Sequence, residues 1–169
     1  DTPAIAEFST GLTMGQCAER LAKGLGLSRE DQDRWALKSH QKAAAATEAG
    51  LYRSQVVPAR VAPSFTPIEA DNGVRGDTTM EKLSSLAPAF DRTFGTVTAG
   101  NSSFLTDGAA ACLLMSAERA EELGVAPLAR VVSTALVAMD PLEELLLGPV
   151  ASVPEALDAA EVPVGEVGV

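Results

Sequence analysis

The chain has 169 residues, with 13 basic and 23 acidic side chains, so its formal charge is −10. A hydrophobic fraction of 46% beside 21% charged residues excludes intrinsic disorder as the default, and the length is sufficient for one domain with a core. The acidic balance excludes a typical nucleic-acid-binding protein, because no basic stripe is present to neutralise phosphates. No apolar run approaches the roughly 18 residues of a membrane span.

Two helices are predicted near the N-terminus. Thr13 and Gln16 have the spacing of a capping box, and apolar residues then recur on one helical face: Met14, Cys17, Ala18, Leu21 and Leu25. Gly24 and Gly26 end this helix. Ser28 begins a second helix that ends at Gly50. We expect its inner face to carry Trp35 as the one large residue among small ones: Ala36, Ser39, Ala43 and Ala46.

Short elements and loop follow. Gln55–Val61 is typical of a short strand, which Pro58 restricts to a sheet edge or a bulge. Proline and glycine mark Pro63–Asp77 as loop. Thr78–Leu86 is predicted to be a short helix, since Thr78 and Glu81 again have capping-box spacing.

After Phe90 the pattern changes to strands alternating with helices. The expected strands are Thr96–Thr98, which precedes a polar turn at Gly100–Ser103, and Ala129–Met139. The expected helices are Ala117–Leu123, capped by Ser116, and a last helix that begins with the capping box Ser152–Glu155. Ala109–Met115 is uninterrupted and apolar, and its periodicity does not decide between a buried strand and a buried helix.

Residue types alone assemble no complete active site. Cys17 lies in a first helical turn, where the dipole can lower a thiol pKa, but its place on the apolar face favours a packed side chain. Cys112 is expected in the core. His40, the only histidine, has no carboxylate nearby in sequence to orient it, which favours a structural or exposed imidazole over a general base. The two cysteines form no CxxC or Cys/His pattern that would predict zinc.

Three polar segments have simple interpretations. Gly100–Ser103 could bind a small polar group through backbone donors and hydroxyls, although a plain turn is favoured. Arg75 is most simply solvated or paired with Asp71 or Asp77. The acidic run Ser28–Asp33 is most simply a solvated helix start.

Longer motifs resemble a known family. Gly95–Ala111, GTVTAGNSSFLTDGAAA, resembles the GTVTAGNxSxxxDGAAA signature of thiolases, and Leu86–Phe90 resembles their LxPAF segment. Thr13–Gly15 with Ser28–Asp33 resembles their "TMG…SRExQD" helical hairpin. Asp71–Arg75 and Leu145–Pro149 are similar to the branch that includes the β-subunit of the fatty-acid trifunctional enzyme.

The resemblance implies a partial thiolase fold of the α/β class, with a helical loop domain plus strands and helices from a layered α-β-α core. Residues 1–90 would be the loop domain that binds coenzyme A, 91–140 the end of the N-terminal core half, and 141–169 the start of the C-terminal half. In this frame Ala109–Met115 is a buried strand. The chain begins at Asp1 without Met, and we expect an internal fragment of a longer protein.

The resemblance also implies roles for residues. Thiolases cleave 3-ketoacyl-CoA with free CoA through a cysteine nucleophile, and neither Cys17 nor Cys112 lies in the matching motif. The nucleophile, the histidine of the GHP motif and the second cysteine are expected outside this chain, which alone would be inactive. The residues implied to bind coenzyme A are Met14, Arg75, Leu83, Leu86, Phe90, Ala99, Ser102, Ser103 and Leu105. Lys82 and Phe104 stand where many family members have Ser and Gly.

The hypothesis is therefore a CoA-binding fragment of a 3-ketoacyl-CoA thiolase of fatty-acid β-oxidation. The alternatives are a biosynthetic acetoacetyl-CoA thiolase and a non-catalytic acidic interaction module on a thiolase-derived scaffold. We expect coenzyme A as substrate, no cofactor and no metal. The expected partners are a second copy in a homodimer or homotetramer and an α-subunit of a trifunctional-type complex, with no nucleic acid. A bacterial cytoplasm is the expected compartment, with the mitochondrial matrix as alternative.

Overall fold

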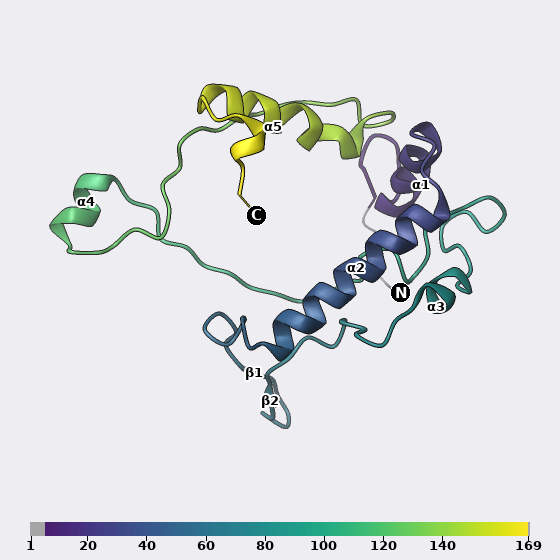
Figure 1. Ribbon diagram of the computed structural model, residues 1–169, viewed down its shortest axis with the longest axis horizontal. Coiled ribbons are helices and arrows are strands. Elements are labelled where there is room, and N and C mark those ends of the chain that lie inside the picture. The colour runs from purple at the N-terminus through teal and green to yellow at the C-terminus, as the bar shows by residue number, and fades with distance from the viewer. Residues whose placement is uncertain (1–5, 169) are drawn as a thin grey trace. The chain divides into compact units, whose positions relative to one another are not determined.

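The computed structural model describes residues 6–168 and divides the chain into two compact units, Asp1–Phe104 and Leu105–Val169 (Figure 1). Each unit is described by itself. The first contains α1, α2, β1, β2 and α3, and the second contains α4, α5 and two short 3₁₀ turns.

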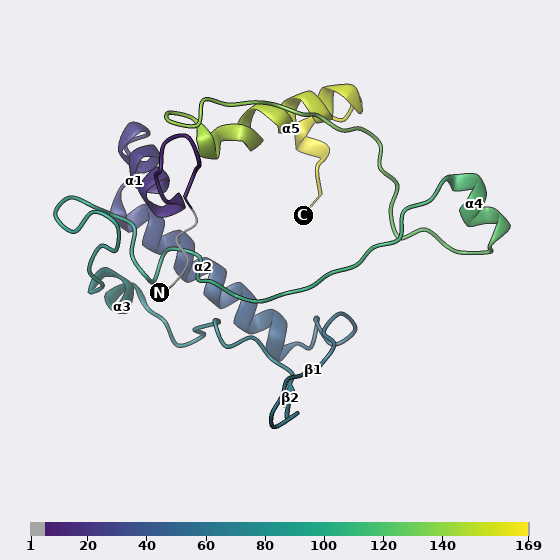
Figure 2. The same cartoon turned by 180° about the vertical axis from the view of Figure 1, so that it is seen from behind.

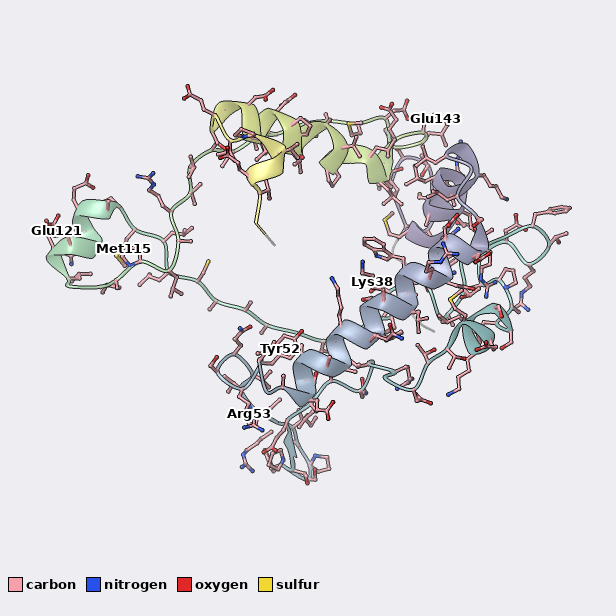
Figure 3. The ribbon with its side chains drawn as sticks, viewed as in Figure 1. Lys38, Tyr52, Arg53, Met115, Glu121 and Glu143 are labelled. Carbon is pink, nitrogen blue, oxygen red and sulfur yellow. The ribbon has the colours of Figure 1, made fainter. Side chains whose placement is uncertain are left out.

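The two N-terminal helices have the predicted starts. In α1 (Met14–Gly24) the Thr13 hydroxyl accepts from the Gln16 N–H while the Gln16 side chain accepts from Thr13 N–H, which completes the capping box. Ser28 and Asp31 form the equivalent box at the start of α2 (Arg29–Glu48). Gly50 follows α2 at φ +70°, a left-handed conformation that glycine adopts without strain. Figure 3 labels Tyr52 and Arg53 just beyond this end of α2.

The elements that follow are short. β1 (Ala59–Arg60) and β2 (Pro67–Ile68) form a two-stranded antiparallel sheet in which Ala59 lies opposite Ile68. The predicted strand Gln55–Val61 is thus confirmed only near its C-terminal end, and β2 lies in the segment predicted to be loop. α3 (Met80–Ser84) lies within the predicted helix and packs against α2. Thr96–Thr98 forms no ladder; Thr98 makes only an isolated bridge with Pro88.

The second unit is mostly helix and extended connection (Figure 2). Ser116 caps α4 (Ala117–Glu122), as predicted. The last helix, α5 (Gly148–Ala159), begins four residues earlier than the predicted cap at Ser152, which lies inside it. The 3₁₀ turn Leu145–Leu147 leads directly into α5, and Pro149 occupies its first turn, where the missing N–H is no loss. A second 3₁₀ turn, Val164–Glu166, follows α5.

Two predicted strands of this unit are absent. Residues 109–115 and 129–139 have no regular secondary structure, and most of their side chains are exposed, with Leu113 at 82% and Leu136 at 97%. Cys112 is exposed as well, so its predicted core position is wrong. A strand obtains its backbone hydrogen bonds from a neighbouring strand, and within residues 6–168 none pairs with either segment.

The interior of the first unit is partly polar. Cys17 is buried, as predicted, together with Ala22, Leu83 and Val97. Three polar side chains are buried beside them: Glu19, Asp33 and Thr98. The prediction that Ser28–Asp33 is a solvated helix start is therefore wrong at Asp33, which has no exposed surface and bonds to Arg29 of its own helix and to Asn101. Trp35 is 75% exposed rather than an inner residue.

Candidate functional site

A turn at residues 96–103 forms one wall of the site, and the buried carboxylate of Glu19 on α1 holds its beginning. The Thr96 N–H donates to both carboxylate oxygens, at 3.0 and 2.9 Å, and the Val97 N–H donates to Oε1 at 2.9 Å. The Thr96 hydroxyl donates to Oε2 at 3.2 Å. One carboxylate thus satisfies consecutive backbone donors that no strand neighbour serves.

Asp33 on α2 holds the end of the same turn. Its Oδ2 accepts from Arg29 Nε at 2.7 Å, and its Oδ1 accepts from Asn101 Nδ2 at 2.9 Å. Asn101 in turn donates to the Thr96 carbonyl at 3.0 Å and accepts from the Thr98 N–H at 2.7 Å. These contacts use both amide hydrogens and the Oδ1 oxygen of the Asn101 side chain. The conformation of the turn is therefore fixed from both ends.

Thr98 lies at the centre of the turn and has no exposed surface. Its hydroxyl accepts from the Gly100 N–H at 3.2 Å, while its carbonyl accepts from the Ser102 hydroxyl at 2.6 Å and the Ser102 N–H at 3.1 Å. Both hydrogen-bonding groups of Ser102 are thus directed inward. Ser103 is exposed, and its hydroxyl makes only a 3.3 Å contact with the Phe104 carbonyl, so it is the more available of the two serines.

α3 supplies an apolar wall. Leu83 is 2% exposed, and its carbonyl accepts a hydrogen bond from the Arg29 guanidinium. A Cβ at Gly100 would lie 2.5 Å from Leu86 Cδ1 and 2.7 Å from Leu83 Cδ2, closer than real contacts allow. Glycine at this position therefore allows the turn to lie against the two leucine side chains.

The loop around residues 72–78 closes another side. The Arg75 N–H donates to His40 Nδ1 on α2 at 3.2 Å, and the Arg75 guanidinium donates to the Asn72 carbonyl at 2.8 Å. A Cβ at Gly73 would lie 1.7 Å from Phe104 Cζ, so the Phe104 ring lies directly on the Gly73 backbone. His40 is thus structural, which agrees with the favoured interpretation of its sequence position.

These walls line a pocket of about 800 Å³ within the first unit, and the pocket is open to solvent. Its residues come from α2, the 72–78 loop, α3 and the turn: Trp35, Ala36, Ser39, His40, Asn72, Gly73, Arg75, Thr78, Lys82, Leu83, Leu86, Ala99, Gly100, Asn101, Ser102, Ser103 and Phe104. The set includes Arg75 and Lys82 but no Asp or Glu, although the chain has 23 acidic residues and a charge of −10. A pocket with apolar walls and cations but no carboxylate is suited to an elongated anionic ligand.

Six of the nine residues predicted to bind coenzyme A line this pocket: Arg75, Leu83, Leu86, Ala99, Ser102 and Ser103. Met14 and Phe90 do not. Met14 is half-buried at the start of α1, and the Phe90 ring lies over Gly15, where a Cβ would be 2.1 Å from Cζ. Leu105 is the first residue of the second unit and is 60% exposed.

Sequence reasoning missed the contribution of α2. Trp35, Ala36, Ser39 and His40 line the pocket at successive turns of one helix face. Their spacing is visible in the sequence, where most of them were assigned to an inner face. Their position beside a pocket depends on where the 72–78 loop lies, which no local pattern predicts.

In the described structure no partner positions either cysteine as a nucleophile. Cys17 is buried and Cys112 is exposed. Within residues 6–168 no group of three His, Cys, Asp or Glu side chains could hold a metal ion. In the same part of the chain, no helix combines the length and apolar character needed to cross a membrane.

The motif resemblance is supported by comparison with known proteins. Residues 2–118 match the family described as "Thiolase, N-terminal domain". The chain belongs to the thiolase family. It is 53% identical over 158 residues to a 3-ketoacyl-CoA thiolase of Erwinia tasmaniensis, covering 94% of this chain and 36% of that relative. It is 48% identical over 164 residues to a 3-ketoacyl-CoA thiolase of Escherichia coli O1:K1, covering 97% of this chain and 38% of the relative.

The fold comparison agrees. The structure is similar to a crystal structure of the Bacillus anthracis acetyl-CoA acetyltransferase, with a TM-score of 0.88 and 36% sequence identity. The match covers 95% of this chain and 41% of that one. The fold is thus a partial thiolase fold, as predicted, and the thiolase chain described here spans little more than a third of the length of its curated relatives.

Proposed function

We propose that this thiolase chain is the coenzyme A-binding part of a 3-ketoacyl-CoA thiolase, an enzyme that transfers an acyl group from a 3-ketoacyl-CoA to free CoA. The observation that carries the proposal is the carboxylate-free pocket, which brings together six residues implied by the motif resemblance. Two relatives near 50% identity are named 3-ketoacyl-CoA thiolase, which supports the substrate class.

The chemistry of coenzyme A fits this pocket. The ligand has a nucleotide with several phosphate charges at one end and a long, weakly polar pantetheine arm that ends in the thiol. Arg75 and Lys82 provide cations for the nucleotide, while Leu83, Leu86 and Ala99 provide an apolar wall for the arm. The exposed Ser103 hydroxyl, whose contact with the Phe104 carbonyl is long at 3.3 Å, is available to a pantetheine amide. The chain itself thereby binds and orients the substrate; the acyl-transfer nucleophile is proposed to come from residues outside it.

The proposal is tested by calorimetric titration of CoA into the complete enzyme that contains this chain and into its Arg75→Ala variant. Loss of one charge-assisted contact is expected to weaken CoA binding about tenfold. Arg53→Ala is the matched control, because Arg53 is an exposed arginine beyond α2 that does not line the pocket (Figure 3). Equal affinity of the wild type and Arg75→Ala would contradict the role of Arg75.

A biosynthetic acetoacetyl-CoA thiolase is the second candidate, favoured by the structural match to an acetyl-CoA acetyltransferase. The two functions differ in acyl length. Thiolysis rates on 3-ketoacyl-CoA substrates of four and of ten or more carbons distinguish them. We propose the degradative enzyme because its relatives have the higher identities, 53% and 48% against 36%.

The finer assignments on assembly are also proposals. We propose a homodimer or homotetramer that associates with an α-subunit, and a bacterial cytoplasm as compartment, since the relatives compared above are all bacterial. Size-exclusion chromatography with light scattering of the complete enzyme measures the oligomer directly.

A further inference from the structure

The pocket has two cationic side chains, Arg75 and Lys82, and they have different partners. Arg75 donates to the Asn72 carbonyl, a neutral group, and keeps the rest of its donors for other contacts. The Lys82 ammonium is instead held by Asp77: Nζ donates to the Asp77 carbonyl at 2.8 Å and to Oδ2 at 2.6 Å. Lys82 lines the pocket, whereas Asp77 does not.

The Lys82–Asp77 pair is accessible to solvent. The side chains are 58% and 79% exposed, and ion pairs at such exposure are weak because water and salt screen them. Lys82 lowers the pKa of the Asp77 carboxyl below its ordinary value, mainly through their hydrogen bond, and the Arg75 charge contributes further. Asp77 therefore stays ionised near pH 7 and remains an internal counter-ion of both cations.

A ligand phosphate would compete effectively with the Asp77 carboxylate for the Lys82 ammonium. A phosphate monoester carries close to two negative charges at pH 7, whereas a phosphate diester or each phosphate within a diphosphate bridge carries about one. The monoester also presents three terminal oxygens to the ammonium and the guanidinium together. Because the existing pair is weak, the ammonium can exchange its partner without disturbing the buried contacts of Leu83 one residue further along α3.

We propose that Lys82 is a phosphate-monoester-binding residue of this pocket and that Asp77 is its built-in competitor, which the ligand displaces. The proposal rests on coenzyme A as the ligand, whose monoester is the 3′-phosphate of its ribose. Lys82 then determines specificity for the 3′-phosphorylated nucleotide, and Asp77 reduces binding of ligands that carry too little charge to displace it.

The test compares coenzyme A with dephospho-coenzyme A, which lacks only the 3′-phosphate, at low and fixed ionic strength in the complete enzyme. Lys82→Gln is expected to weaken CoA binding about fivefold and to change dephospho-CoA binding less than twofold, because only CoA has the monoester. Asp77→Asn removes the competing charge but keeps the shape of the side chain, and it is expected to tighten CoA binding about threefold. In the double variant the Asp77→Asn gain should disappear.

Lys38→Gln is the matched control. Lys38 is an exposed lysine of α2 that does not line the pocket (Figure 3), so its removal changes the net charge by the same amount without touching the proposed contact. Equal weakening of CoA and dephospho-CoA by Lys82→Gln, or an effect of Lys38→Gln as large, overturns the proposal while leaving coenzyme A as the ligand. Failure of the wild type to bind either nucleotide overturns the proposed function as well.

Discussion

Asp33 and Asn101, which lie 68 positions apart in sequence, are joined by a 2.9 Å hydrogen bond in the interior of the first unit. Asp33 lies on α2 and has no exposed surface, and Asn101 lies in the turn that lines the pocket. Their contact makes the helix a support for the ligand-facing turn. The position of the turn thus depends on a carboxylate that does not itself line the pocket.

Replacement of Asp33 tests this support. Asp33→Ala leaves the Arg29 guanidinium and the Asn101 amide without their partner, and breaking a buried ion pair from one side is expected to cost about 3 kcal/mol in the free energy of unfolding. Urea unfolding of the chain measures this cost. Glu30→Ala, which removes an exposed carboxylate from the same helix, should cost no more than about 1 kcal/mol. Equal costs for the two variants would contradict a supporting role for Asp33.

Glu19 makes a second, independent support. Glu19→Gln removes the negative charge and leaves one acceptor oxygen. At the Oε1 position this oxygen can still accept from the Thr96 and Val97 N–H groups, but the contacts of Oε2 with the Thr96 N–H and hydroxyl are lost, and the remaining bonds are no longer charge-assisted. The expected cost is about 1–3 kcal/mol, with faster amide hydrogen exchange at Thr96 and Val97. Glu48→Gln at the exposed end of α2 is the control and should leave both amides protected.

The sequence was sufficient for the starts of the two N-terminal helices because their signals are local. The predicted capping box at Thr13 forms, and Ser28 begins α2 as expected, each through contacts between residues three positions apart. The predicted strand at residues 109–115 fails for the opposite reason. Its apolar composition is a local signal, but a strand exists only through a neighbour that its own residues do not specify.

The same difference between local and long-range signals applies to the residues of the pocket and its supports. Arg75, Leu83 and Ser103, which the motif resemblance assigned to one ligand, line the same pocket. The resemblance did not predict the burial of Glu19 and Asp33, which bond to the turn across 77 and 68 positions of the sequence. Acidic side chains on helices are ordinarily solvated, so only the folded chain reveals that these two are structural.

Gly95 lies between the Asp91 backbone and the Glu19 carboxylate. A Cβ there would lie 2.3 Å from the Asp91 carbonyl oxygen and 2.5 Å from Glu19 Oε1, and the backbone atom cannot move aside cheaply. Gly95→Ala is therefore expected to destabilise the chain by about 1–3 kcal/mol and to lower its melting temperature. Gly108→Ala is the control, since no atom lies within 4 Å of its Cβ. A Gly95→Ala chain as stable as this control would show that the turn packs differently.

His40 is predicted to position Arg75 rather than to transfer protons. His40→Ala removes the acceptor of the Arg75 N–H and should weaken CoA binding about fivefold, which corresponds to one net hydrogen bond. In steady-state assays of the complete enzyme this raises KM for CoA and leaves kcat unchanged. His40→Asn, whose Oδ1 can replace Nδ1 as acceptor, should recover most of the affinity. A large fall in kcat with unchanged KM would contradict the positioning role.

The Lys23–Asp91 ion pair gives the first unit a measurable acid dependence. The Lys23 hydrogen bond at 2.7 Å is the largest cause that lowers the pKa of Asp91 to about 2, followed by the Phe94 N–H. Because the folded pKa is below the unfolded value of about 3.9, this contribution to stability is present above that value and is lost as pH falls toward about 2. Lys23→Met should raise the pKa of Asp91, measured by NMR titration of its carboxyl carbon. It should reduce the stability difference between pH 5 and pH 2, and an unchanged titration curve would show that Lys23 does not hold Asp91 in solution.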